Sequence, residues 1–182
     1  ARLTGDAGIL PSRHFTENRR WREMLQRANR FFNLVGKKVE QKEVQARVDV
    51  LARSSVFGEV PLNDLKVLAI MFERRSLADG DILCRAGDPA SCVFAIASGE
   101  IDVYLPGHDQ PVAKRTTGDI VGEYGMFLKS GRSATRCAVG PTSVLTLDYK
   151  HFKRFLLAFP ESMISLFEMC VQRLDTQQTK PH

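Results

Sequence analysis

With 182 residues, of which 43% are hydrophobic and 26% charged, the chain has the size and composition of one globular domain with some additional helices. Its longest uncharged runs, residues 89–99 and 137–147, are too short to span a bilayer, and the N-terminus lacks the ordered regions of a signal peptide. The four cysteines show no Cys-x-x-Cys or Cys/His metal spacing, so we expect free thiols, no metal site and a cytoplasmic protein.

Residues 1–50 carry the positive charge of the chain. They hold 11 Lys/Arg and 6 Asp/Glu, a surplus equal to the net charge of +5. Amphipathic helices are predicted over residues 16–35 and 38–53, because apolar residues recur there at intervals of three and four. A basic surface can bind nucleic acid. The apolar stripes and interspersed glutamates instead favour a linker or docking arm, residues 14–53, that contacts an effector protein, with no nucleic acid bound by this chain alone.

The sequence between residues 54 and 147 changes from helical to strand-like. A short helix is predicted within residues 54–72, with Asn63 as its N-terminal cap. From residue 73 on, short apolar runs alternate with Gly-Asp or Gly-Glu pairs. Glycine accommodates a positive φ, and the acidic side chain can accept hydrogen bonds from neighbouring amides. Short strands separated by such turns predict a compact antiparallel β-roll.

Helical periodicity returns after Asp148. Residues 149–159 present one apolar face, and Pro160 separates this helix from a second one over residues 161–178. The apolar stripe predicted for the second helix consists of Met163, Phe167, Cys170 and Leu174. The predicted fold class is α+β: an antiparallel, jelly-roll-like β-roll flanked by N-terminal helices and a C-terminal helix pair. Residues 51–182 form this domain, after the basic segment 1–50.

Residues 122–135, GEYGMFLKSGRSAT, are neither strand-like nor a tight turn. The run after Gly122 can form one helical turn whose free amides attract an anion. Arg132 could bind the same anion with a forked contact, and Ser133 adds a hydroxyl. Glu123 would repel that anion unless a neutral donor, such as a sugar hydroxyl, lies between them. Each of these residues alone is more often a solvated loop residue that binds nothing. Together, they indicate a ligand with a phosphate beside a ribose.

Residues 118–135, GDIVGEYGMFLKSGRSAT, closely resemble the phosphate-binding cassette of the cyclic nucleotide-binding domain family, which includes catabolite-activator-like regulators and cyclic-nucleotide-gated channels. The family pattern is an aromatic or aliphatic residue, Gly-Glu, a short apolar helix and Arg-(Ala/Ser/Thr)-Ala-Thr. The matching positions are Val121, Gly122-Glu123, Tyr124 to Leu128 and Arg132-Ser133-Ala134-Thr135. The strands at 77–105, the helical lead-in and the last two helices are similar to the family as well, so the resemblance covers residues 51–180.

The resemblance implies a role for each cassette residue. Glu123 would accept a hydrogen bond from the ribose 2′-hydroxyl, and Arg132 would pair with the cyclic phosphate. Ser133 and nearby backbone amides would complete the phosphate cradle. The last helix would act as a lid over the base, with Arg173 at a base-side position. The predicted ligand-binding residues are Gly122, Glu123, Tyr124, Gly125, Met126, Arg132, Ser133, Ala134 and Arg173.

Three positions depart from the family pattern. Gly131 replaces the proline often found before the arginine, which is expected to loosen the loop. Val121 is smaller than the usual aromatic residue. Ser133, in place of alanine, is closer to bacterial regulator or channel-like domains than to kinase regulatory subunits. Because Glu123 and Arg132 are both retained, we expect a site that binds its ligand.

We therefore expect a regulatory sensor that binds a 3′,5′-cyclic mononucleotide, with cAMP favoured over cGMP, and signals to an attached or partner effector through movement of the lid helix. Two alternatives stay open: the ligand-binding part of a DNA-binding transcription regulator whose helix-turn-helix lies outside this chain, and the cytoplasmic gating domain of a channel. No catalytic motif is present and the four histidines are scattered, so an enzyme is not expected. No cofactor is expected besides the nucleotide, and a homodimer through the helices stays open.

Overall fold

The computed structural model describes residue 23, residues 38–127 and residues 131–178. The predicted helix over residues 16–35 lies, apart from residue 23, outside the described residues. The elements are α2 (Lys38–Leu51), α3 (Leu62–Met71), β1 (Glu73–Leu77), β2 (Ile82–Cys84), β3 (Cys92–Tyr104), β4 (Ala113–Thr116), β5 (Ile120–Val121), α4 (Tyr124–Phe127), β6 (Thr135–Asp148), α5 (Tyr149–Ala158) and α6 (Pro160–Gln178).

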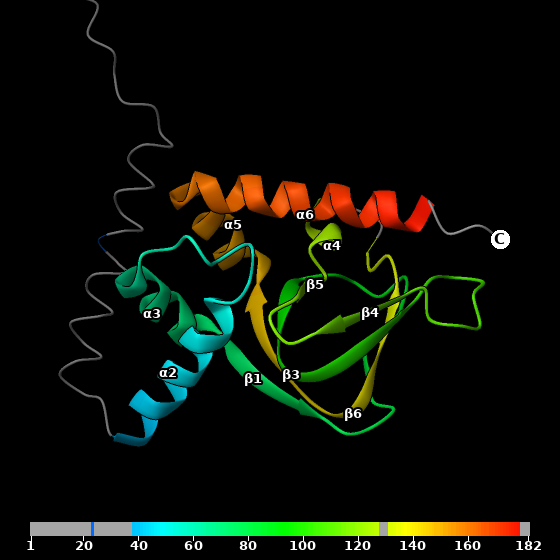
Figure 1. Cartoon of the computed structure of the whole chain (residues 1–182), viewed down its shortest axis with the longest axis horizontal. Helices are drawn as coiled ribbons and strands as arrows, with labels where there is room; N and C mark the ends of the chain where they lie inside the picture. The colour runs from blue at the N-terminus through cyan, green and yellow to red at the C-terminus, as the bar shows by residue number, and fades with distance from the viewer. Residues whose placement is uncertain (1–22, 24–37, 128–130, 179–182) are drawn as a thin grey trace, which may run out of the picture.

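One antiparallel sheet forms the centre of the molecule (Figure 1). Its strands follow the order β1-β6-β3-β4, with β2 paired to β6 and β5 paired to β3. The long strand β3 shifts its register against β6 on both sides of Ser98. Next to this shift, Gly99 has a φ of +82°, and a Cβ there would lie 2.4 Å from Thr142 Oγ1. A bulge at a position that only glycine can occupy bends the strand and lets the sheet curl. The predicted antiparallel β-roll is confirmed.

Three Gly-Asp pairs, at residues 80–81, 87–88 and 118–119, form turns of the predicted kind. The glycines have φ values of +78°, +84° and +94°. Each aspartate accepts a 2.8 Å hydrogen bond from the backbone amide three residues earlier. The acidic side chain thus satisfies an amide that would otherwise have no partner at the turn. This local chemistry fixes where the adjacent strands end.

The helices outside the cassette pack together around four phenylalanines. Phe57 contacts Phe72 edge to face with 5.9 Å between ring centroids, and its centroid lies 5.1 Å from that of Phe155 and 6.1 Å from that of Phe152. All four rings are buried, and they join the lead-in and α5 to the sheet in one core. A second core fills the roll and consists of Leu77, Leu83, Phe94, Ile96, Ile101, Val121, Ala138 and Val144.

Two details of the N-terminal helices differ from the prediction. α2 ends at Leu51 rather than at residue 53. The prediction that Asn63 caps the next helix is wrong, because α3 begins at Leu62 with Pro61 in the N-cap position. The carbonyl of Pro61 accepts hydrogen bonds from the amides of Asp64 and Leu65, both at 2.9 Å. The helix therefore closes its first turn on Pro61, two residues before the predicted cap Asn63.

Helix α6 starts at Pro160, whose fixed φ suits the first position of a helix. It runs over α4 and β5 (Figure 1). The stripe predicted for α6 is wrong in orientation, because Cys170 is buried but Phe167 is 69% exposed, and Met163 and Leu174 are exposed as well. The buried face instead consists of Ser162, Leu166, Cys170 and Arg173. Apolar residues lie on both faces of α6, so periodicity alone could not select the packed one.

Among the described residues, no single helix has the length and hydrophobicity to cross a membrane; the pair of α5 and α6, bent by 116° at its break, passes by length and composition alone. Those residues contain no cluster of three His, Cys, Asp or Glu that could hold a metal ion. The four cysteines are free thiols, and Cys84 and Cys170 are buried.

Candidate functional site

A cavity of about 150 Å³ lies at the meeting point of the sheet, the 122–135 loop and α6. Five of the predicted site residues line it: Glu123, Tyr124, Ser133, Ala134 and Arg173. Its apolar wall consists of Val103, Leu105, Val121 and Leu174. Its charged groups are Glu123 and three arginines, Arg115, Arg136 and Arg173. The cavity therefore combines apolar surface with an excess of positive charge, which suits an anionic ligand with a flat apolar part.

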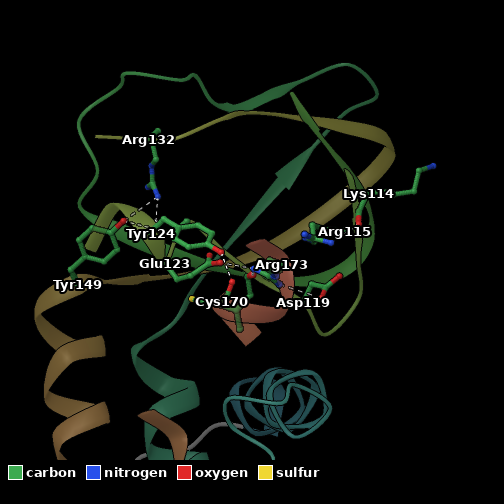
Figure 2. A network of polar contacts seen from close by, with 11 residues as sticks. Lys114, Arg115, Asp119, Glu123, Tyr124, Arg132, Tyr149, Cys170 and Arg173 are labelled. Atoms are coloured by element: carbon green, nitrogen blue, oxygen red, sulfur yellow. Dashed lines mark hydrogen bonds and ion pairs between the residues drawn. The ribbon is translucent and has the colours of Figure 1, made fainter. Parts of the chain in front are cut away.

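Glu123 and Arg173 form an ion pair at the base of this cavity (Figure 2). Arg173 Nη1 lies 2.5 Å from Glu123 Oε1 and donates to the Ile120 carbonyl at 2.7 Å, while Nη2 lies 3.5 Å from Asp119 Oδ1. The two residues are 1% and 9% exposed, so water screens the pair little. The second carboxylate oxygen of Glu123, Oε2, is buried and has no partner among the described residues. It is therefore an acceptor without a donor, in a residue that lines the cavity.

Tyr124 makes a second link between the loop and α6. Its hydroxyl donates to the Cys170 carbonyl at 2.9 Å. Burial, together with the nearby Cys170 and Glu123, raises the pKa of Tyr124 to about 12. Burial and the charge of Glu123 likewise raise the pKa of the Cys170 thiol to about 11. Both groups are therefore neutral at physiological pH, and the contact between α4 and α6 is an ordinary hydrogen bond.

Arg132, the predicted phosphate partner, does not line the cavity. Its Nη1 donates to the carbonyl of Cys92 at 2.9 Å and to that of Gly122 at 3.3 Å, and it lies 3.3 Å from the Tyr149 hydroxyl. Its guanidinium carbon sits 4.8 Å from the centroid of the Phe94 ring. Figure 2 shows Arg132 and Tyr149 together, apart from Arg115 and Arg173. In this structure the Arg132 guanidinium is bound by protein groups, and its role towards a phosphate stays a prediction.

The remaining cassette positions shape the backbone around Arg132. Gly122 has a φ of +88°, and a Cβ there would lie 2.4 Å from Arg132 Nη1. A Cβ on Gly125 would lie 2.7 Å from the Tyr149 hydroxyl. The Met126 amide donates to the Glu123 carbonyl at 3.0 Å, so this amide is already engaged and is not free for a phosphate cradle. These glycines thus permit the close approach of Arg132, which precedes β6, and of Tyr149 from α5.

The expectation that Gly131 loosens the loop is wrong. Its φ is +85°, which proline cannot adopt, and a Cβ there would lie 2.6 Å from the Asp88 carbonyl oxygen. The next residue is held on both sides, because the Arg132 amide donates to Asp88 at 2.9 Å and the Arg132 carbonyl accepts from Gly87 at 2.8 Å. Gly131 therefore permits a tight contact between the cassette and the turn at residues 87–88.

Two charged cavity residues were not found from the sequence. Arg136 is 5% exposed, and its Nη1 donates to the Ala134 carbonyl at 3.1 Å and to Cys84 Sγ at 3.6 Å. Burial lowers the pKa of Arg115, and the charge of Arg173 lowers it further. Strand alternation was the available signal for Arg136, since Ala134, Arg136 and Ala138 share the buried face. A charged residue at an inward position is an exception that an active or binding site can explain.

Part of the chain matches a known family of proteins. Residues 74–159 match the family model described as cyclic nucleotide-binding domain. The cAMP-dependent protein kinase regulatory subunit of Emericella nidulans is 31% identical over 108 residues, which cover 54% of this chain and 25% of that protein. The cyclic AMP receptor protein of Thermus thermophilus is 23% identical over 124 residues, covering 66% of this chain and 57% of that protein.

A solved structure shows the same fold. The cAMP-bound PfPKA-R structure superposes with a TM-score of 0.68 at 23% identity, over 80% of this chain and 50% of that one. At this identity the superposition establishes the β-roll with its flanking helices and no more. The chain spans a quarter of the length of the kinase regulatory subunit that it matches and 57% of the receptor protein. The activity and partners of the whole relatives are therefore not transferred by the match itself.

Proposed function

Because residues 74–159 match the family model of the cyclic nucleotide-binding domain, we propose that this chain binds a 3′,5′-cyclic mononucleotide in the cavity and thereby regulates an attached or partner effector. The observation that carries the proposal is the unpartnered, buried Oε2 of Glu123 in the wall of that cavity. A buried acceptor without a donor costs about 1–3 kcal/mol. A ribose hydroxyl would supply the missing donor, whereas a phosphate alone would be repelled by the carboxylate.

The phosphate is assigned to Ser133 and Arg132, next to this sugar position. Ser133 lines the cavity and offers a hydroxyl. Arg132 is the residue next to Ser133. Its present hydrogen-bond partners are neutral: two backbone carbonyls, a phenol and a thiol. Hydrogen bonds between a guanidinium and an anionic phosphate are charge-assisted and frequently bidentate, which adds both energy and geometric specificity. The proposal therefore includes a rotamer change that turns Arg132 from Cys92 and Tyr149 to the bound phosphate.

Helix α6 is the element that would transmit the signal. Arg173 and the Cys170 carbonyl bind it to Glu123 and Tyr124 of the cassette. A nucleotide that binds beside Glu123 changes the surroundings of this ion pair, and it would favour whichever α6 position it binds more tightly. Each tenfold difference in affinity between the two positions is worth about 1.4 kcal/mol, so a hundredfold difference shifts the equilibrium by roughly 3 kcal/mol. The effector would contact residues 14–53 or α6 itself.

The relatives support a regulatory role in preference to catalysis. One is named as the regulatory subunit of a kinase and the other as a receptor protein, and both names specify cAMP. We accordingly propose cAMP as the ligand to test first, in a cytoplasmic regulatory protein that is not itself an enzyme. The receptor protein favours one second candidate, the ligand-binding part of a transcription regulator.

Nucleotide binding is tested by calorimetric titration and by thermal unfolding of the whole chain with cAMP, cGMP and 5′-AMP. Ligand that binds only the folded state stabilises it by about 2.7 kcal/mol at a hundredfold excess over Kd. We expect at least one cyclic nucleotide to raise the melting temperature and 5′-AMP, which has a dianionic and acyclic phosphate, to have little effect. If neither cyclic nucleotide binds or raises the melting temperature at saturating concentration, the proposed function is wrong.

A further inference from the structure

Arg136 lies in the wall of the cavity, and the sugar and phosphate assignments leave it without a function. Its side chain is 95% buried and its charge has no carboxylate partner among the hydrogen bonds and ion pairs of the described residues. Among the described residues, Glu123 is the only carboxylate that lines the cavity, and it is bound by Arg173. Burying an arginine with so few partners is costly, and a ligand that supplies acceptors would remove that cost.

One edge of the Arg136 guanidinium makes no hydrogen bond among the described residues. The two hydrogen bonds that Arg136 donates there both leave from Nη1, to Ala134 and Cys84. The Nε atom is buried and has no partner among the described residues. Nε and Nη2 form the other edge of the planar group, which presents two parallel N–H donors. This unpaired edge therefore matches a ligand with two adjacent acceptors in one plane.

The position of Arg136 in the sheet indicates which part of the ligand it meets. In the register of β3 and β6, Arg136 lies opposite Val103, which belongs with Leu105 to the apolar wall of the cavity. Glu123 and Ser133, assigned to the sugar and phosphate, belong to the loop. A nucleotide anchored at the loop would place its flat base against the strand wall, beside Arg136.

We propose that Arg136 reads the purine base, donating from Nε and Nη2 to the O6 and N7 acceptors of guanine. This inference rests on the proposed function. Guanine presents both acceptors on that edge, whereas adenine presents N7 beside the N6 amino group, which is a donor and faces the guanidinium unfavourably. Arg136 therefore raises the affinity for cGMP relative to cAMP, whatever preference the other contacts of the site impose.

The test is the ratio of Kd values for cAMP and cGMP, measured by calorimetry on the whole chain. In Arg136→Met, an apolar side chain of similar length replaces the guanidinium. The preference for cGMP relative to cAMP should then fall by about 5- to 150-fold, which is the discrimination that a bidentate arginine–guanine pair provides. Arg136→Lys keeps the charge without the fork and should lose most of the same preference. Cyclic IMP, which has O6 and N7 but lacks the guanine amino group, should follow cGMP in every variant. Arg75→Met, at an exposed position of β1, is the matched control and should leave the ratio unchanged.

A second measurement does not depend on how well the variants fold. The unmodified chain should bind 7-deaza-cGMP, which lacks the N7 acceptor, more weakly than cGMP. Equal affinities for these two nucleotides would overturn the inference, as would a nucleotide ratio that is unchanged in folded Arg136→Met. Equal weakening of cAMP and cGMP by that substitution would place Arg136 at the phosphate or sugar and would likewise overturn base reading. If the unmodified chain binds no cyclic nucleotide, the proposed function fails and this inference fails with it.

Discussion

Arg132 can be singled out from the sequence, but the residues that surround it in the structure cannot. Its place in the cassette follows from local sequence, but its contacts come from two distant segments: β3, with the Cys92 carbonyl and the Phe94 ring, and α5, with the Tyr149 hydroxyl. Tyr149 also donates to the Gly122 carbonyl at 2.5 Å, so the arginine completes a network around that residue. Arg132 therefore stabilises the fold in this structure, in addition to any role towards a ligand.

The substitution Arg132→Leu tests this dual role. It removes donors from two carbonyls and a cation–π contact with Phe94, so the free energy of unfolding should fall by about 1–3 kcal/mol. Urea unfolding measures this change, and titration with the nucleotide measures the separate loss of affinity, expected to be about 1.5–3 kcal/mol for the lost charged contact. Arg85→Leu is the control, since that side chain is exposed in the neighbouring turn and its loss should change neither quantity. Stability equal to that of the unmodified chain would show that the Arg132 contacts contribute nothing to the fold.

The loop and the roll meet through backbone atoms, and glycines make that approach possible. Gly131 and Gly107 have nearly the same φ, +85° and +80°, but different surroundings. A Cβ on Gly131 would lie 2.6 Å from the backbone oxygen of Asp88, whereas nothing lies within 4 Å of a Cβ on Gly107. A backbone oxygen cannot rotate away as a flexible side chain can, so the contact at Gly131 constrains the whole segment.

Comparing Gly131→Ala with Gly107→Ala separates the cost of a positive φ from the cost of the close contact with Asp88. Both variants pay for a positive φ, about 1–2 kcal/mol in an alanine. Gly131→Ala should cost a further 1–3 kcal/mol or so, because the added methyl group overpacks against Asp88. Chemical denaturation of both variants gives the difference directly. Equal destabilisation would mean that the cassette shifts away from the 87–88 turn without cost.

Across the whole molecule, two tyrosine hydroxyls join α6 and α5 to the cassette beside the Glu123–Arg173 ion pair, and the Cys170 thiol lies near one of them. Burial raises the pKa values of Tyr124 and Tyr149 to about 12, and burial with the charge of Glu123 raises that of Cys170 to about 11. Each of these pKa values lies above its usual one, so the folded state holds its proton more tightly than the unfolded state does. The stability that this provides is complete below the usual pKa and decreases as the pH rises through the folded-state value.

The free energy of unfolding should therefore decrease above about pH 9, first through Cys170 and, above about pH 10, through the tyrosines. Urea unfolding at pH 8, 9.5 and 10.5 measures the decrease. The variant Cys170→Ala lacks the thiol and should show a shallower dependence between pH 9 and 10. A stability that is flat to pH 10.5 in the unmodified chain would contradict the assignment of these groups as buried neutral acids.

The sequence by itself determined the features that depend on neighbouring residues. Gly-Asp pairs specify their turns through a positive φ and a local hydrogen bond, apolar runs between them specify strands, and the spacing of Glu123 and Arg132 identifies the cassette and its family. The same local reasoning failed at Asn63 and Gly131, where a carbonyl and a turn from other positions compete with the expected local chemistry.

The tertiary structure alone decided how these parts face one another. Both sides of α6 are apolar enough to pack, and the side with Arg173 is buried because Glu123 and the Ile120 carbonyl offer that guanidinium its partners. Arg136 follows the cassette on an alternating strand, but only the curl of β3 and β6 turns its side of the strand into the wall of a cavity. Long-range packing and charge pairing set these orientations, and no pattern within a short window of sequence records them.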